Sequence, residues 1–155
     1  MDIPFTRSDI WLFLSIGLAD PPADLANVLL RGDALNKAMM SPQEVRRGLS
    51  KLSQAGLAID SAGIYSLTEK GLELIDNAGA RRQGFLAAQS DLAKHLCVIH
   101  GPNDDPRFDD PRFPYPQLSD EILQGAYREA YRRFQDINKR VVSDVNRKKG
   151  RSTDA

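Results

Sequence analysis

The side chains best suited to chemistry lie in the second half of the chain. His95, Cys97 and His100 place two imidazoles and a thiol close together in the sequence, and these are the usual ligands of zinc. His95 and His100 are five residues apart, however, so they point in different directions on a helix, and no carboxylate is spaced to complete a tetrahedral set. We therefore expect no metal site and no cofactor, with Cys97 buried and both histidines at the surface.

Two acidic pairs belong to a tandem repeat, in which the pentapeptide Asp-Asp-Pro-Arg-Phe occurs at residues 104–108 and again at 109–113. Carboxylate oxygens are good ligands for divalent cations, but an acidic, solvated loop is the simpler interpretation. The sequence contains no glycine-rich phosphate loop, zincin motif or nucleophile elbow. We therefore predict that the chain is not an enzyme.

The composition indicates a folded protein outside the membrane. Hydrophobic residues make up 41% of the 155 positions, which is enough for a packed core. A single cysteine excludes an internal disulfide framework and fits a reducing compartment. The sequence begins Met-Asp-Ile-Pro-Phe without the basic region of a signal peptide, and no apolar run is long enough to span a bilayer. These features favour a soluble, cytoplasmic protein.

The charges are unevenly distributed along the chain although the net charge is zero. Residues 1–80 hold 7 basic and 10 acidic side chains, whereas residues 118–155 hold 9 and 6. Proteins that bind nucleic acid tightly usually have a basic footprint. The whole-chain balance therefore argues against tight nonspecific binding to DNA.

The strongest local signal is Ser41-Pro42-Gln43-Glu44, which combines a capping box with proline at the first helical position. The helix that it opens is expected to reach Ala55 and to end at Gly56. Its apolar side consists of Val45, Gly48, Leu49, Leu52 and Ala55. Its polar side consists of Gln43, Arg46, Arg47, Ser50, Lys51 and Gln54. Helical periodicity separates the two sets completely, so we predict one face in the core and the other in solvent.

The remaining pattern predicts a mainly α fold with a small β-hairpin. Helices are expected at residues 9–18 (capped by Ser8), at 20–36 and from Thr68 onward, with a helical continuation over 79–97. Alternating residues predict short strands around a four-residue turn at 60–63. Leu49, Leu52 and Leu67 are expected in the core. Five prolines make residues 98–118 irregular, with Phe108 and Phe113 as anchors. A last helix is expected over 119–147, capped by Ser119, and a basic, disordered tail over 148–155.

This order of elements resembles the winged helix-turn-helix family, in the versions found in bacterial MarR and PadR transcriptional regulators. The resemblance is carried by Leu49-Ser50-Lys51-Leu52-Ser53-Gln54-Ala55-Gly56-Leu57 and by Tyr65-Ser66-Leu67-Thr68-Glu69-Lys70-Gly71. It implies a winged helix-turn-helix domain over residues 6–78, followed by a C-terminal helical extension. It covers about 70 residues and is silent about residues 98–155.

The resemblance also implies a function, because the third helix of the family enters the major groove of DNA. Its DNA-facing residues would be Gln43, Arg46, Arg47, Ser50, Lys51 and Gln54. Arginine can pair bidentately with guanine, glutamine can pair with adenine, and lysine can neutralise phosphate. The expected function is therefore that of a transcriptional regulator that binds double-stranded DNA.

Two features favour a different function within the same fold. The wing, residues 58–66, contains no lysine or arginine and has Asp60 at its turn, although a wing on phosphate is usually basic. The domain is also net acidic, so its field would not steer it toward DNA. The alternative is an adaptor, a winged-helix module for protein–protein interaction that does not bind nucleic acid.

The last helix carries an apolar stripe made of Leu123, Tyr127, Ala130, Tyr131, Phe134, Ile137, Val141 and Val145. The stripe can pack on the first helix of its own domain or on the same helix of a second subunit. Its length favours a homodimer formed through this C-terminal helix. Cations on the opposite side (Arg128, Arg132 and Lys139), with the cluster at 147–151, can contact phosphate or simply improve solubility.

Overall fold

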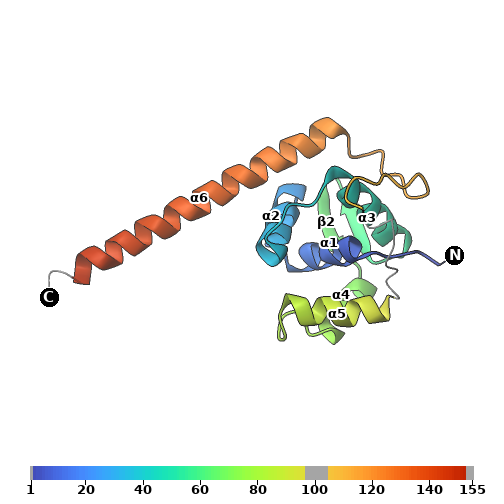
Figure 1. Ribbon diagram of the computed structural model, residues 1–155, viewed down its shortest axis with the longest axis horizontal. Helices are drawn as coiled ribbons and strands as arrows, with labels where there is room; N and C mark the ends of the chain where they lie inside the picture. Colours follow the sequence, from blue (N-terminus) through green and yellow to red (C-terminus); the bar gives the residue numbers. More distant parts are fainter. Residues whose placement is uncertain (1, 97–104, 153–155) are drawn as a thin grey trace.

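A computed structural model describes residues 2–96 and 105–152 of the chain. They form six helices and one hairpin (Figure 1). In chain order the elements are α1 (Arg7–Leu18), α2 (Leu25–Asn36), α3 (Pro42–Gln54), β1 (Ala58–Ser61), β2 (Ile64–Leu67), α4 (Glu69–Asn77), α5 (Phe85–His95) and α6 (Asp120–Ser152). The mainly helical class, with a small antiparallel hairpin and a long C-terminal helix, is therefore confirmed.

The central element is α1, around which the other parts of the body pack. Residues 8–16 of this helix are all buried, because it contacts α2, α3, α5 and the hairpin strand β2. Both sides of the helix are thus covered. Its N-terminal cap is Thr6 rather than Ser8, since the Asp9 carboxylate accepts the Thr6 backbone N–H at 2.7 Å and closes a capping box.

The apolar side of α3 lies directly against α1. Leu49 and Leu52 are buried, and Leu67 joins them from β2, as the sequence predicted. The two helices approach closely at Gly48, where an added Cβ atom would lie 2.6 Å from Leu12 Cδ2. A side chain at this position would have to displace the Leu12 side chain within the packed core.

The hairpin is tighter than the sequence suggested. β1 and β2 pair antiparallel with Ala58 opposite Leu67, and the strands extend to Ser61 and Ile64. The turn therefore has two residues, not the four predicted at 60–63. Ala62 and Gly63 have φ angles of 53° and 81°, the conformation of a type I′ turn, whose twist matches that of the strands.

Two predicted helices have different boundaries in the structure. α2 begins at Leu25, not near Asp20, because the side chain of Asp24 caps it by accepting the Asn27 N–H at 2.9 Å. The predicted helical continuation over 79–97 is interrupted, and α5 starts anew at Phe85. Gly79 and Gly84 have φ angles of 64° and 86°, which a right-handed helix does not allow.

The long helix α6 packs on α2, not on α1, and then extends beyond the body (Figure 1). Arg133 Nη1 donates to Asp24 Oδ1 at 2.8 Å and to Asn27 Oδ1 at 2.6 Å. The Tyr127 hydroxyl donates to the Met40 carbonyl at 2.6 Å. The helix continues to Ser152, so residues 148–152 of the predicted disordered tail are helical. In the described part of the chain, no helix combines the length and apolar character needed to cross a bilayer.

The contact between α6 and α2 gives a pH-dependent prediction. The hydrogen bond from Arg133 holds the pKa of Asp24 below its ordinary value of 3.8. A carboxyl whose pKa is lower in the folded state stabilises the protein above the unfolded pKa, and this stabilisation disappears as the pH falls through the folded pKa. Asp24→Asn keeps a good helix cap but removes the charge, so it should cost about 1 kcal/mol at neutral pH, the upper value for a partly exposed pair.

This prediction is checked by urea titrations of both proteins at a series of pH values. The difference in free energy of unfolding between them should shrink below about pH 4, the unfolded pKa of an aspartate. A difference that persists unchanged in acid would show that the charge of Asp24 is not what stabilises the contact.

Candidate nucleic-acid interface and the segment that covers it

The polar side of α3 is where the sequence placed the DNA-facing residues, and the structure buries half of them. Arg47 and Lys51 are each 1% exposed and Ser50 is 4% exposed. Gln43 and Arg46 are half-buried, and Gln54 is exposed. The expectation of a solvent-facing surface is therefore wrong for Arg47, Ser50 and Lys51. Two segments lie over this side of the helix, the N-terminal segment and residues 105–118. We call residues 105–118 the strap.

Lys51 forms a buried ion pair with α1. Its Nζ donates to Asp9 Oδ2 at 2.8 Å and to the Pro4 carbonyl at 2.8 Å, and the Asp9 side chain is fully buried. The ring of Phe113 from the strap lies 5.4 Å from the same nitrogen, within the range of a cation–π contact. The ammonium group is thus enclosed by three separate segments of the chain.

Arg47, one helical turn before Lys51, joins the strap to the body. Its Nη1 donates to the carbonyls of Asp105 and Phe108 at 2.7 and 2.8 Å, and its Nη2 donates to Ser8 Oγ at 3.1 Å. These are charged hydrogen bonds, which are stronger than neutral ones. The guanidinium therefore ties α3, α1 and the strap together at one point.

The two halves of the tandem repeat fold into the same turn. In the first, the Phe108 N–H donates to the Asp105 carbonyl at 3.0 Å, and in the second the Phe113 N–H donates to the Asp110 carbonyl at 3.0 Å. Each aspartate also accepts the backbone N–H two residues later, at 2.8 Å from Arg107 and at 3.1 Å from Arg112. The sequence repeat is therefore a structural repeat.

Each turn contacts a different cation of α3. Carbonyls of the first turn hold Arg47, and the phenylalanine at the end of the second covers Lys51. The prediction that the segment is irregular is confirmed over residues 105–118, where the structure has turns but neither helix nor strand. Phe113 is a buried anchor as expected, whereas Phe108 is half-buried.

The carboxylates of the repeat pair with arginines of the same repeat. Asp110 is 5% exposed and bonds to Arg112 at 2.7 Å, and this contact holds the pKa of the Asp110 carboxyl below its usual value. Asp105 bonds to Arg107 in the same way, with the same direction of pKa shift. Both carboxylates already have cationic partners, which supports the simpler interpretation of an acidic loop over a divalent cation site.

The strap also contacts the start of α3 and the hairpin. Near the start of the helix, Ser41 Oγ bonds to the Pro106 carbonyl. In the hairpin, Asp60 Oδ2 accepts from the Tyr115 hydroxyl at 2.9 Å. Burial, together with this bond to Asp60, raises the pKa of Tyr115. Asp60, the acidic residue of the predicted wing, is therefore bound by the strap.

Arg46 is held where the strap joins α6. Its Nε donates to the Leu118 carbonyl at 2.9 Å, and its Nη2 bonds to the Asp120 carboxylate. Its side chain is 20% exposed. Of the three cations predicted to face DNA, Arg46 alone keeps appreciable contact with solvent.

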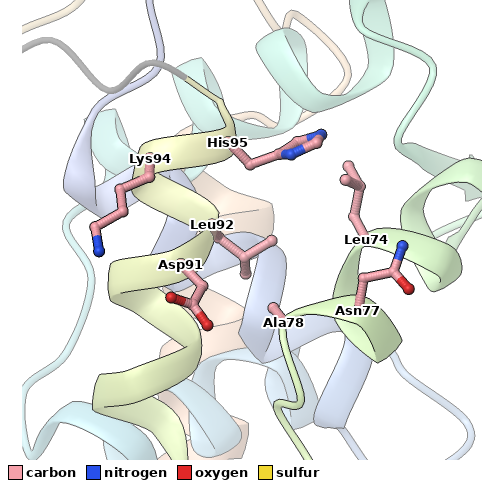
Figure 2. Close-up of a pocket in the computed structure, with 7 residues that line it drawn as sticks. All are labelled: Leu74, Asn77, Ala78, Asp91, Leu92, Lys94 and His95. Atoms are coloured by element: carbon pink, nitrogen blue, oxygen red, sulfur yellow. The ribbon is translucent and has the colours of Figure 1, made fainter.

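A surface depression lies between α4 and α5 (Figure 2). It is lined by Leu74, Asn77 and Ala78 from α4 and its C-cap, and by Asp91, Leu92, Lys94 and His95 from α5. The imidazole of His95 extends toward Leu74, whereas the Lys94 side chain leaves the other side of α5 (Figure 2). The described residues contain no cluster of three metal-ligating side chains. Cys97, His100 and Asp104 lie outside the described residues, so the expectations made for them stay predictions.

Comparisons with family models, with curated proteins and with solved structures gave no match. The winged-helix resemblance therefore stays a prediction. The order of the helices and the hairpin is compatible with it.

Sequence reasoning missed the partners that bury the α3 cations. Asp9 directly precedes the apolar stretch 10–18, and a charged residue on a helix covered from both sides requires a partner of opposite charge. That signal was available.

The buried ion pair predicts a large effect of neutralising Lys51. Lys51→Met keeps the aliphatic stem but leaves Asp9 buried without its cation, which should cost about 3–5 kcal/mol. Gln54→Met, on the same helix but exposed, should stay within about 0.5 kcal/mol of wild type. Denaturant titration measures both.

The double variant Asp9→Asn/Lys51→Met should recover much of the loss, because no unpaired charge remains. A cost for Lys51→Met as small as that of Gln54→Met would mean that Lys51 faces solvent, as the sequence suggested.

Proposed function

We propose that this chain is an adaptor, a protein-interaction module with a winged-helix body, and that α3 does not read DNA. The observation that carries the proposal is the burial of Arg47 and Lys51. Both Nη atoms of Arg47 and the Nζ of Lys51 donate to acceptors within the chain. A side chain that reads a base edge must reach into the groove. In this structure, these two cations cannot do so without unfolding the strap and opening a buried ion pair.

The hairpin supports the same proposal. A wing that lies on DNA contacts phosphate, and phosphate contacts come from cations and N–H donors. Here the Asp60 carboxylate accepts hydrogen bonds from the Gly63 N–H at 2.9 Å and from the Tyr115 hydroxyl at 2.9 Å. Asp60 stays exposed, so the turn presents a negative charge. Neither element of the expected DNA surface is arranged to attract a polyanion.

A run of exposed apolar side chains lies instead on α6. Beyond its contact with α2, this helix exposes the large apolar side chains Tyr131, Phe134, Ile137, Val141, Val142 and Val145. Contiguous apolar surface of this kind marks protein–protein contacts. We take the exposed part of α6 as the interaction surface of the adaptor.

A DNA-binding regulator is the second candidate, and one observation favours it. Residues 137–151 hold six basic side chains and one acidic one (Lys139, Arg140, Asp144, Arg147, Lys148, Lys149 and Arg151). A basic helix of this type can contact phosphates regardless of sequence. Such contacts would come from α6, whereas the regulator expected from the sequence reads bases with α3.

Binding to duplex DNA, measured over a salt series, separates the two candidates. The duplexes come from the genomic neighbourhood of the protein and from scrambled controls. The adaptor should bind both weakly and equally at low salt, and binding should vanish near the physiological ionic strength of about 0.15 M. Lys148→Ala/Lys149→Ala should weaken this residual binding, and Arg46→Ala should leave it unchanged.

The opposite result would establish the regulator. It is a preference for one duplex that survives physiological salt and is lost in Arg46→Ala, the variant that removes the one partly exposed cation of α3.

A further inference from the structure

A cavity of about 440 Å³ lies where the hairpin meets the end of the strap and the start of α6. Three of its described lining residues are apolar (Leu25, Leu118 and Ile122), and three carry polar side chains (Asp60, Tyr65 and Gln117). Ligand pockets usually have a volume of this order and combine apolar walls with a few polar groups. The cavity therefore has the size and the mixed lining of a site for a small ligand or for a side chain of a partner.

The carboxylate of Asp60 keeps part of its hydrogen-bonding capacity free. Its Oδ1 atom accepts from the Gly63 N–H and its Oδ2 atom accepts from the Tyr115 hydroxyl, both at 2.9 Å. Within the described part of the chain, the carboxylate forms no other hydrogen bond. An ionised carboxylate has about four lone-pair sites on its two oxygens, so each oxygen can accept once more. Such a pair of sites fits a group that presents two parallel N–H donors.

Tyr65 adds a polar group that has no partner. Its side chain is buried, with 3% of the residue exposed, and no described residue forms a hydrogen bond with its hydroxyl. Burial, together with the nearby negative charge of Asp60, raises the pKa of Tyr65 to about 12. The hydroxyl therefore lies near the carboxylate and stays protonated at neutral pH. Polar groups of buried residues are rarely left unpaired, and an N–H group of a ligand can supply the partner.

The charges around the cavity favour a cation. Asp60 is the one charged side chain among the described lining residues. Cations on neighbouring elements already have partners, since Arg46 is paired with Asp120. In the same way, Arg133 is paired with Asp24. Asp60 would repel an anion, whereas it would attract an organic cation, whose aliphatic stem could lie on the apolar part of the lining.

We propose that this cavity binds a guanidinium group, with Asp60 as its bidentate acceptor and the Tyr65 hydroxyl as a further acceptor. The strap contains the same chemistry, because the Arg112 guanidinium bonds to both oxygens of Asp110, at 2.9 and 2.7 Å. A guanidinium holds its donors in a rigid planar fork, whereas an ammonium is a compact point charge. The inference goes beyond the proposed function, because this site is separate from the exposed part of α6.

The guanidinium can belong to an arginine side chain of a partner protein or to a free small molecule, and three probes distinguish these sources. Butylguanidinium stands for the free molecule, N-acetyl-arginine N-methylamide stands for an arginine within a peptide, and butylammonium has the same charge without the fork. Each is titrated into the full chain at low salt, where surface charges are least screened, and binding is followed by NMR.

The signals of Gly63 and Ile122 should shift and saturate with both guanidinium probes. Both should bind about fivefold more tightly than butylammonium, because only they can bond to both carboxylate oxygens at once. Tighter binding of the capped arginine than of butylguanidinium assigns the site to a side chain of a partner protein. Equal or weaker binding of the capped arginine assigns it to a free small molecule.

Three variants test the residues. Asp60→Asn should weaken binding of both guanidinium probes about tenfold, because a hydrogen bond to a charged group is replaced by a neutral one. Tyr65→Phe removes a hydroxyl that has no partner in the described chain, so it should leave the fold intact and weaken binding about threefold. Asp76→Asn removes an exposed carboxylate of α4, outside the cavity, and is the matched control with unchanged binding. Circular dichroism confirms that each variant is folded.

The absence of saturable shifts with the guanidinium probes overturns the inference. Equal binding of butylammonium, or binding that is unchanged in Asp60→Asn, overturns it as well. None of these outcomes bears on the DNA-binding assay, which tests the proposed function independently.

Discussion

The structure depends on the buried ion pair between Lys51 of α3 and Asp9 of α1. Removing two charges from water costs several kcal/mol for each ion, so other groups of the chain must bind the pair in place of water. The bonds to Asp9 all go to its Oδ2 atom, and its Oδ1 atom has no hydrogen-bond partner among the described residues. The Pro4 carbonyl and the Thr6 N–H supply partners at 2.8 and 2.7 Å, and the ring of Phe113 closes the site. The N-terminal segment, two helices and the strap must therefore meet at one place.

Because of this requirement, α3 differs from an ordinary amphipathic helix. α3 has an apolar side on α1 and a polar side that would face solvent in a simpler protein. Here the polar side has its own partner, because the turns of the strap offer carbonyls to Arg47 and an aromatic ring to Lys51. The polar side of α3 is thus internal at Arg47, Ser50 and Lys51, and α6, which begins where the strap ends, carries an exposed apolar surface away from the body.

Several helix caps were predictable from the sequence, whereas the burial of the polar side of α3 by distant segments was not. The capping box of Ser41 and Glu44 and the caps by Thr68 and Ser119 were predicted correctly, since each depends on residues within one helical turn. Periodicity also separated the two sides of α3 correctly. It could not show that the polar side is covered, because the covering residues are 39 to 61 positions away. The prolines showed that residues 105–118 are irregular, but the path of the strap depends on backbone carbonyls, which leave no trace in the sequence.

The burial of Lys51 is the central feature of the structure. It is measured most directly by the rate at which an amine-acylating reagent modifies each lysine of the native protein. Lys139 and Lys148 are exposed and report the rate of an accessible amine. Peptide mass spectrometry should find Lys51 almost unmodified when these two have reacted fully, and modified at their rate once the protein is denatured. Modification of Lys51 at the rate of Lys139 in the native protein would contradict the buried ion pair and return the polar side of α3 to solvent.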